Sequence, residues 1–526
     1  MRKKIPHLGS FLLLLSALGL MNSALQGQTI IRNFSGLNLN DVFSLGAGGG
    51  TPPDSMGAAG PDQFVEFING AFAIYNKSGT RQLLISDRNF WLNAGISAAT
   101  VSAGASDPRI LYDAGSGRWF ATEITVQSTS NQVLVARSDT SDPGGGWKAV
   151  HFTGNASFAD YDTLGVDAAG VYISVNNFDA FDNFTGVSLF SIPKADLTNA
   201  TPTLANLTAF ENINDQIYGF TLQGVTNPDP GPGHGVIIAI DNAAFKFFDR
   251  TTINGAGTAG ATLSPTVRIS TTYDAGPHPA TQPSGQTVDA LDDRFSGSVR
   301  QVGTNLFMAN TILEAGRDAV HWLVLDETSN TLLGEGLISD PGFDFFQPSI
   351  AANHNGKILL TFNRSGPTSP GGNISIYAAL GNVSGGGVTM GLPFLLKQGT
   401  VDNFTISFDS APYRWGDYSA TMVDPTDDDL FWCIQEIPFS STGWGTQITL
   451  LSVNPNTPSL TITPAGTNML LTWPASTDPA YLLETTTALQ PPAIWTPVAN
   501  PVAISFNQNV VTTPKTAGAN FYRLKK

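Results

Sequence analysis

The chain has 526 residues, enough for more than one domain, and only 13% of them are charged, while Gly numbers 54 and Pro 33. This composition is typical of many short strands joined by turns, and the apolar fraction of 41% excludes a disordered chain. The net charge of −16, with no run of basic residues, excludes nucleic acid as the main partner.

The N-terminus has the features of an export signal. Basic residues at 2–4 precede an apolar run at 11–20 that is too short to span a bilayer, and small residues at 23–27 offer a cleavage site. We therefore expect residues 1–27 to be removed and the protein to be secreted, into the periplasm or the extracellular space. No other apolar run reaches the length of about 18 residues that a membrane helix needs, so no membrane span is predicted.

Residues 28–49 are predicted to be a lead-in segment, and a repeated hairpin follows it. In each copy an apolar strand ends at an Asp or Asn, a turn follows, and a second apolar strand leaves the turn. The clearest turns lie at Asp113, Asp167, Asn353 and Asp424. Weaker copies turn near residues 60, 227 and 303, so that seven turns follow one another at spacings of roughly 50 to 76 residues.

Repeats of this length, each with three or four short strand candidates, predict an all-β fold. The architecture that they favour is a seven-bladed β-propeller over residues 50–455, because radial packing buries both faces of every blade. The alternative is a β-solenoid, whose rungs would be shorter and more regular than these repeats.

The composition changes at Pro455 and Pro458, which suits a linker. Residues 459–526 contain several short strand candidates with turn signals between them. This pattern predicts a small β-sandwich that folds independently of the propeller.

Two of the repeats, at residues 107–120 and 414–432, resemble secreted bacterial β-propeller proteins of the sialidase-like superfamily, and the resemblance covers residues 50–455. The segment 140–147 resembles the Asp-box of that superfamily, which is a hairpin turn remote from the catalytic site. The resemblance therefore implies a structural role for the Asp-box positions, which are Thr140, Asp142, Gly144 and Trp147. The tail resembles the fibronectin-III-like modules that end some exported bacterial proteins.

The resemblance also implies what a sialidase would need: an arginine triad, a Tyr–Glu nucleophile pair and an Arg-Ile-Pro motif. The Arg-Ile-Pro motif is absent from this sequence. Arg109, Arg300 and Arg414 offer cations from three different repeats, although no motif assigns them to a triad.

The first strand of each propeller blade lines the central channel, so the residue at the start of that strand lies at a channel mouth. Asp54, Asp107, Asp160 and Asp417 occupy such positions. The first two precede their turns by six residues and the other two by seven, so a common side-chain direction is not expected. Convergent carboxylates would need a cation, a basic partner such as Arg414, or raised pKa values. The alternative is structural, with each Asp accepting hydrogen bonds from nearby backbone amides.

The predicted ligand-binding residues are polar and aromatic side chains at this mouth: Asp107, Arg109, Asp160, Tyr161, Arg414, Trp415, Asp417 and Tyr418. The polar groups can hydrogen-bond a sugar, and the rings of Tyr161, Trp415 and Tyr418 can stack on it. No catalytic residue and no cofactor is predicted, and calcium is the one candidate ion.

The chain is therefore predicted to be an exported, monomeric, non-catalytic propeller that binds or scaffolds glycan or protein ligands. The alternative is a sialidase-like glycoside hydrolase that acts through carboxylates at the channel mouth, a reaction that needs two carboxyl groups at a defined separation. The missing enzyme motifs favour binding over catalysis.

Overall fold

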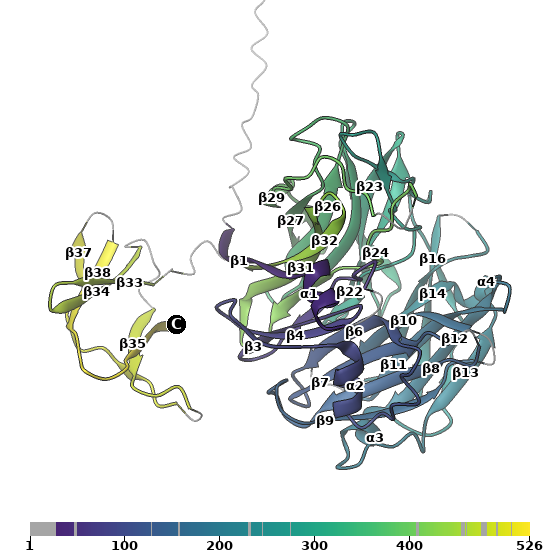
Figure 1. Ribbon diagram of the computed structural model, residues 1–526, viewed down its shortest axis with the longest axis horizontal. Helices are drawn as coiled ribbons and strands as arrows, with labels where there is room; N and C mark the ends of the chain where they lie inside the picture. The colour runs from purple at the N-terminus through teal and green to yellow at the C-terminus, as the bar shows by residue number, and fades with distance from the viewer. Residues whose placement is uncertain are drawn as a thin grey trace, which may run out of the picture.

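The computed structural model of the chain consists mainly of short β-strands (Figure 1). The structure describes residues 28–46, 50–127, 129–155, 158–229, 233–244, 246–273, 275–406, 410–453, 458, 460–474, 481–490, 493–505 and 508–525. The predicted export signal, residues 1–27, lies outside these described residues. The helices in the described part are short: α1 (Leu39–Ser44), α2 (Asp87–Asn93), α3 (Lys194–Thr198) and α4 (Asp215–Tyr218). The all-β prediction is confirmed.

Seven antiparallel sheets of four or five strands lie between residues 29 and 452 of the described chain. The first sheet contains β2 (Met56–Ala59), β3 (Gln63–Ile68), β4 (Ala71–Asn76) and β5 (Arg81–Ile85). The second contains β6 (Ala105–Asp113), β7 (Arg118–Thr125), β8 (Gln132–Ser138) and β9 (Trp147–Thr153). The third contains β10 (Phe158–Val166), β11 (Gly170–Phe178), β12 (Phe184–Pro193) and β13 (Thr208–Ile213).

The remaining four sheets continue in chain order. The fourth contains β14 (Phe220–Gly224), β15 (Val236–Ile240), β16 (Phe247–Asn254), β17 (Thr262–Leu263) and β18 (Val267–Ser270). The fifth contains β21 (Arg300–Val302), β22 (Asn305–Glu314), β23 (Arg317–Asp326) and β24 (Thr331–Ile338). The sixth contains β25 (Asp344–Ala352), β26 (Lys357–Ser365), β27 (Ser375–Ser384), β28 (Gly387–Met390) and β29 (Phe394–Lys397). The seventh contains β30 (Ala420–Asp424), β31 (Asp427–Ser440), β32 (Gly443–Ser452) and β1 (Thr29–Asn38), and a separate two-stranded ribbon pairs β19 (Ala280–Thr281) with β20 (Thr287–Val288).

The first strands of these sheets contact one another in a closed ring. β2 contacts β6, β6 contacts β10, β10 contacts β14, and β25 contacts both β21 and β30. Thr226, just after β14, forms a parallel bridge with Arg300 of β21, and β30 contacts β2. A closed ring of small antiparallel sheets is the arrangement of a β-propeller and not of a solenoid. The number of blades stays a prediction, for which these seven sheets are the candidates.

The central strands of the sheets are buried on both faces. Every residue of β4 except the last is buried, and so is every residue of β15 except the last. Their sequences are accordingly continuous apolar runs instead of alternating ones, because a neighbouring sheet covers each face.

The segment predicted to be a lead-in takes part in the ring. Strand β1 pairs with β32 along its length, from Thr29 opposite Ser452 to Asn38 opposite Gly445. Nearby, the buried carboxylate of Glu66 accepts hydrogen bonds from the Leu37 amide and the Tyr75 hydroxyl. The N-terminal strand therefore completes the sheet that the C-terminal strands of the ring begin.

The Asp-box-like segment forms the turn between β8 and β9. The Asp142 carboxylate accepts a hydrogen bond of 2.9 Å from the Gly144 amide, and the Thr140 hydroxyl accepts one from the Asp142 amide. The Trp147 ring packs edge-on against Phe90. These contacts are those of a structural turn, and the assignment to the Asp-box itself stays a prediction.

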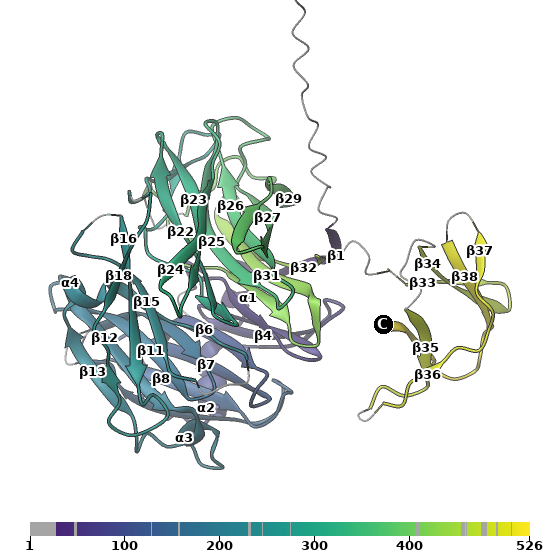
Figure 2. The same cartoon turned by 180° about the vertical axis from the view of Figure 1, so that it is seen from behind.

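The C-terminal segment forms two small sheets of its own, drawn in yellow in Figures 1 and 2. One contains β33 (Thr461–Ala465), β34 (Asn468–Pro474), β38 (Gln508–Pro514) and β37 (Ala503–Ser505), and the other contains β36 (Thr496–Pro497), β35 (Leu482–Thr486) and β39 (Phe521–Lys525). Leu471, Trp473 and Val511 of the first sheet share a buried apolar cluster with Leu483 of the second. The fibronectin-III-like assignment stays a prediction.

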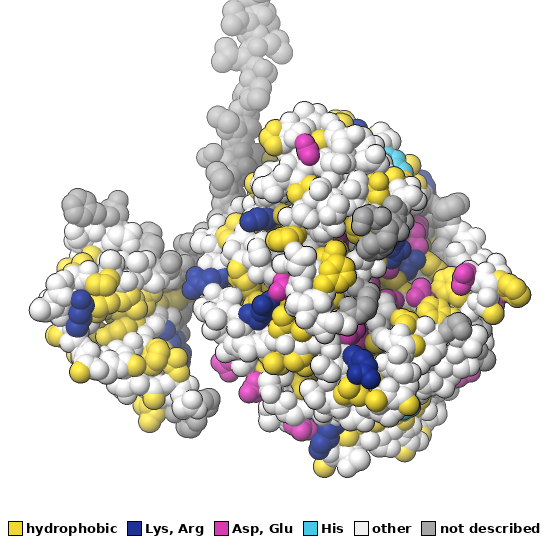
Figure 3. Space-filling view, viewed as in Figure 1, with side chains coloured by type: hydrophobic (Ala, Val, Ile, Leu, Met, Phe, Trp, Pro, Cys, Tyr) yellow, Lys and Arg dark blue, Asp and Glu magenta, His cyan; other side chains and the backbone are white. Residues whose placement is uncertain are grey.

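The surface in Figure 3 shows the lysine and arginine side chains scattered singly instead of gathered in a patch. None of the helices in the described part of the chain has the length and hydrophobicity that crossing a bilayer requires.

Candidate functional site

A polar cavity of about 300 Å³ lies where the innermost strands begin. Its charged lining consists of four aspartates and two arginines: Asp54, Asp107, Asp160, Asp417, Arg294 and Arg414. We call this cavity the channel mouth. The aspartates that start four different sheets do converge there, although their spacing to the turns differs.

The backbone explains how side chains with different spacings converge. Asp54, Asp107 and Tyr161 all have left-handed backbone, with φ of 50°, 63° and 54°, and the pairing of the second and third sheets is interrupted by a bulge at this point. Tyr161 therefore takes the same position in β10 that Asp107 takes in β6. Asp160 lies one residue before that position. A bulge resets the alternation of side chains along a strand, so both carboxylates reach the same cavity.

Two of the four carboxylates join neighbouring sheets. Asp54 accepts a hydrogen bond of 2.8 Å from the Asp417 amide, and Asp107 accepts one of 2.9 Å from the Tyr161 amide. The Asn69 side chain, which lies outside the predicted site, donates to Asp54 and accepts from the Asp107 amide. Asp54 and Asp107 thus fit the structural alternative, in which the aspartates accept bonds from backbone amides.

Asp417 is paired with a cation. Arg414 donates a hydrogen bond of 3.1 Å to the Asp417 carboxylate. Burial raises the pKa of Asp417 to about 6, Arg414 opposes this shift, and the negative charge of Asp107 adds to it. Burial likewise raises the pKa of Asp54 well above its usual range, with the charges of Asp417 and Asp107 adding to the shift.

Asp160 is the most available carboxylate of the four. It is half-buried, and among the described residues it accepts a hydrogen bond from the Tyr161 backbone but none from a side chain. Burial, followed by the charges of Asp107 and Asp417, raises its pKa to about 7, while Arg294 and the Tyr161 amide oppose the shift. This carboxyl can therefore change its protonation near neutral pH and still reach a ligand in the cavity.

Arg294 belongs to the site although the repeats do not indicate it. It lies in the connection before β21, where its guanidinium binds both carboxylate oxygens of Asp292, each at 2.6 Å. The guanidinium also lies 4.2 Å from the centre of the Tyr161 ring. Its place in the connection between β20 and β21, away from the start of a first strand, explains why the repeat pattern does not indicate it.

Arg109 was predicted to bind ligand, but it lies beneath the mouth. Its side chain is buried and donates to the carbonyl oxygens of Asp162 and Ser296. The guanidinium stacks 3.4 Å from the centre of the Tyr418 ring, whose hydroxyl donates to the Pro108 carbonyl. These two side chains form the floor of the mouth instead of its surface.

Trp415 also lies in the core. It is 1% exposed, its indole nitrogen donates to Asn363, and its ring packs against Phe346 and Phe404. Of the three rings predicted to stack on a sugar, only that of Tyr161 lines the cavity, and it too is only 2% exposed. The positions of these rings therefore do not support the predicted stacking role.

The three arginines that might have formed a triad are separated. Arg109 is enclosed by carbonyl oxygens, Arg414 is paired with Asp417, and Arg300 lines a different cavity. The three predicted arginines therefore do not form a triad, and the two arginines that line the mouth, Arg294 and Arg414, are each bonded to an aspartate.

The acidic turn after β30 is occupied by the protein's own groups. Asp424 accepts hydrogen bonds from Lys77 at 2.7 Å and from the Trp432 indole at 2.9 Å. Asp428 accepts from both the amide and the ring of His354. These carboxylates are therefore already compensated, and they do not need a calcium ion.

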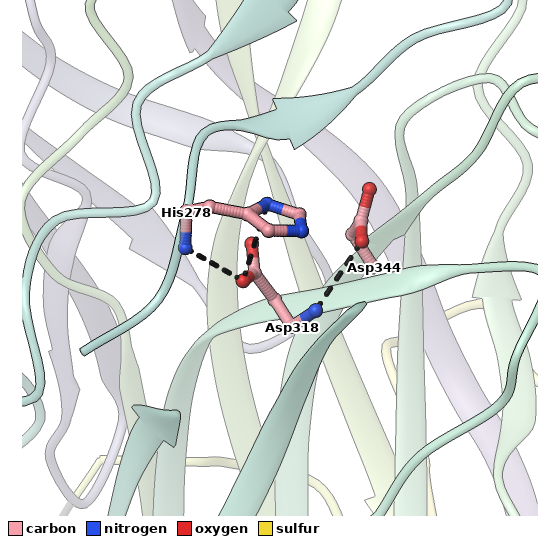
Figure 4. A group of neighbouring side chains, drawn as sticks. All are labelled: His278, Asp318 and Asp344. Carbon is pink, nitrogen blue, oxygen red and sulfur yellow. Dashed lines mark hydrogen bonds and ion pairs between the residues drawn. The ribbon is translucent and has the colours of Figure 1, made fainter. Parts of the chain in front are cut away.

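A second cluster of possible metal ligands contains His278, Asp318 and Asp344 (Figure 4). The two ring nitrogens of His278 lie 3.1 Å from the carbonyl oxygens of Pro279 and Gly316. Because carbonyl oxygens only accept hydrogen bonds, both nitrogens carry protons and neither offers a lone pair to a metal. Asp344 is moreover paired with Arg317 at 3.0 Å. This arrangement is a group of charge pairs and not a metal site.

The raised pKa values at the mouth predict a pH dependence of stability. A carboxyl whose folded pKa exceeds its unfolded value binds more protons in the folded state, so stability falls as pH rises from about 4 to above 7. Asp160→Asn removes one such group without changing its shape. We expect this variant to melt about 2 °C above the wild type at pH 8 and to match it at pH 4.5.

Thermal melts of both proteins across this pH range measure the effect. Asp62→Asn, at an exposed position in the turn between β2 and β3, is the matched control and should follow the wild type at every pH. A lower melting temperature of Asp160→Asn at both pH values would contradict the assignment of Asp160 as an unfavourably buried carboxyl.

Comparison with known proteins gives similarity only at the level of distant solved structures. No family model and no curated protein matches this chain. The α-L-arabinanase of Cellvibrio cellulosa is 12% identical, with a TM-score of 0.32, over 64% of this chain and 95% of its own. The Hadza microbial sialidase Hz136 is 13% identical, with a TM-score of 0.34, over 75% of this chain and 65% of its own. The WD40 domain of SCAP from fission yeast is 10% identical, with a TM-score of 0.32, over 75% of this chain and 82% of its own. TM-scores this low carry no conclusion about function.

Proposed function

We propose that the protein is an exported, non-catalytic β-propeller that binds a neutral glycan at the channel mouth. One observation carries the proposal: the cavity is walled by polar groups, and Asp160 is the one aspartate there that accepts no side-chain hydrogen bond from the described residues, whereas the other three each accept one. Sugar hydroxyls donate hydrogen bonds to carboxylates, and a cavity of about 300 Å³ is large enough for one sugar ring.

The charge of the mouth selects against acidic sugars. Four carboxylates surround the cavity, and its two arginines are already bonded to Asp292 and Asp417. An added negative charge would meet repulsion without a free cation to offset it. A neutral glycan avoids this cost.

The same contacts favour binding over hydrolysis. Glycoside cleavage needs two carboxyl groups that are free to act on the substrate, one as acid and one as base or nucleophile. Asp54 and Asp107 are bonded to backbone amides of neighbouring sheets, and Asp417 is bonded to Arg414. Asp160 is left without a partner carboxylate for that chemistry.

The experiment is a glycan array that carries neutral and sialylated glycans, probed with residues 28–526 in the presence and absence of calcium. We expect neutral glycans to bind, and Asp160→Asn to weaken that binding about tenfold without lowering the melting temperature. Asp62→Asn should bind like the wild type. Failure to bind any neutral glycan would contradict the proposal, and binding that requires calcium would assign the ion to the mouth.

Hydrolysis is tested on the same glycans by measuring released reducing sugar. Turnover that disappears in Asp160→Asn or Asp417→Asn would replace the proposal with the glycoside-hydrolase alternative.

The proposal includes three predictions made from the sequence. These are removal of residues 1–27, a propeller of seven blades whose last blade includes β1, and an independently folding fibronectin-III-like tail from residue 459. The protein would act as a monomer, with the tail joined to the propeller by a proline-containing linker.

A further inference from the structure

A second and larger cavity lies at the opposite end of the innermost strands. Its volume is about 480 Å³, and it is lined by residues at the ends of β2, β6, β25 and β30. The channel mouth is instead lined by residues at or just before the beginnings of β2, β6, β10 and β30. We call it the distal cavity. It shares no lining residue with the channel mouth, so what it binds is independent of the glycan proposal.

Much of the wall of the distal cavity is apolar. Small or flexible side chains come from three different sheets: Ala58, Ala59, Ala351, Ala352, Met422 and Val423. Small residues leave the space open, and a cavity of this size is within the range that binds small molecules. The body of a ligand here would lose its contact with water.

Arg300 brings a guanidinium group to the lining of this cavity. Among the residues that the structure describes, its side chain makes no hydrogen bond, ion pair or ring contact, and its Nε is buried without a partner. Burial lowers the pKa of Arg300 to about 10. A guanidinium without a partner in an apolar setting is unfavourable unless an anion joins it.

The carboxylates near Arg300 are bonded to other groups of the protein. Asp424 is bonded to Lys77 and Trp432, and Asp428 is bonded to His354. The side chain of Gln301, next to Arg300, donates to Glu327, which is itself paired with Arg250. None of these groups compensates Arg300 in the described structure.

We propose that the distal cavity binds a small monocarboxylate with an apolar body, its carboxylate on the Arg300 guanidinium and its body against the alanine-rich wall. The guanidinium offers two parallel N–H groups, a geometry that matches a carboxylate. The apolar body contributes through the surface that it removes from water. A dianion such as phosphate fits less well, because one guanidinium does not balance it and Asp427 and Asp428 line the same cavity.

Calorimetric titration of residues 28–526 with octanoate tests the proposal. We expect octanoate to bind, and acetate and 1-octanol to bind at least about tenfold more weakly, since each lacks one half of the recognised ligand. Arg300→Gln should weaken octanoate binding at least about tenfold. Arg81→Gln, an exposed arginine in β5 paired with Asp41, should leave it unchanged.

Stability provides a second readout that separates a binding role from a structural one. Arg300→Met removes a half-buried charge that has no partner among the described residues, so its melting temperature without ligand should equal or exceed that of the wild type. Octanoate should raise the melting temperature of the wild type and leave that of Arg300→Met unchanged. Absence of octanoate binding, equal affinity in Arg300→Gln, or a clear loss of stability in Arg300→Met would each overturn the proposal.

Discussion

Deletion of residues 28–38 should abolish the cooperative melt of the ring or lower its midpoint drastically. These residues include β1, which pairs with β32 along its whole length. Every residue of β32 is buried, so loss of β1 would leave its backbone groups without partners and would expose its apolar side chains. Each lost hydrogen bond costs about 0.5–1.5 kcal/mol net, and several of them together with the newly exposed apolar surface exceed about 5 kcal/mol.

The buried Glu66 increases this cost. Its carboxylate accepts from the Leu37 amide, and burial raises its pKa to about 7, so loss of this donor leaves it less well compensated. Circular dichroism and calorimetry of the truncated protein measure the effect. A synthetic peptide of residues 28–46 added to the truncated protein should restore part of the lost stability, because it supplies the missing strand.

A substitution in the same strand is the control. Ile30 is 40% exposed, so Ile30→Ser should change stability by less than about 0.5 kcal/mol. A truncated protein that melts like the wild type would show that the ring closes without β1.

Arg109→Ala should destabilise the protein by about 3–5 kcal/mol. The substitution leaves the carbonyl oxygens of Asp162 and Ser296 without donors and opens a space beside the Tyr418 ring. It also leaves the buried Asp162 carboxyl, whose pKa burial already raises, without its nearest cation. Chemical denaturation of the variant measures the loss.

Arg109→Met separates the two roles that have been considered for this residue. Methionine keeps most of the volume but none of the hydrogen bonds, so a structural role predicts a smaller but clear loss of stability, about 2 kcal/mol. A role in ligand contact, as the sequence analysis predicted, would instead weaken glycan binding and leave the melt unchanged. That second result would place Arg109 at the surface of the mouth.

The candidate site was partly predictable because its aspartates recur at the starts of strands. Asp107, Asp160, Arg414 and Asp417 all line the cavity that their repeat positions indicated. Asn69, by contrast, lies at a turn, and its role depends on two carboxylates from different sheets. A residue whose contacts join two repeats cannot be recognised from the sequence pattern of either repeat.

The aromatic residues show that the sequence did not predict the direction in which a side chain points. Tyr161, Trp415 and Tyr418 stand next to the aspartates in sequence, yet all three side chains are nearly fully buried. Composition indicates that an aromatic ring is near a site, but it does not indicate which side of the strand the ring takes. A bulge with left-handed backbone at Tyr161 sets that direction, and a bulge is stabilised by contacts on both sides of the strand.

The sequence by itself determined the class of fold, because apolar runs separated by Asp- and Gly-rich turns are local features with local physical causes. It also determined that the strand starts would carry carboxylates. Only the tertiary structure decided that β1 completes the last sheet, that Arg109 lies under the mouth, and that Arg294 and Asn69 belong to it. The physical reason is distance along the chain: these contacts join residues from different sheets, and which partners meet depends on how the whole ring packs and closes.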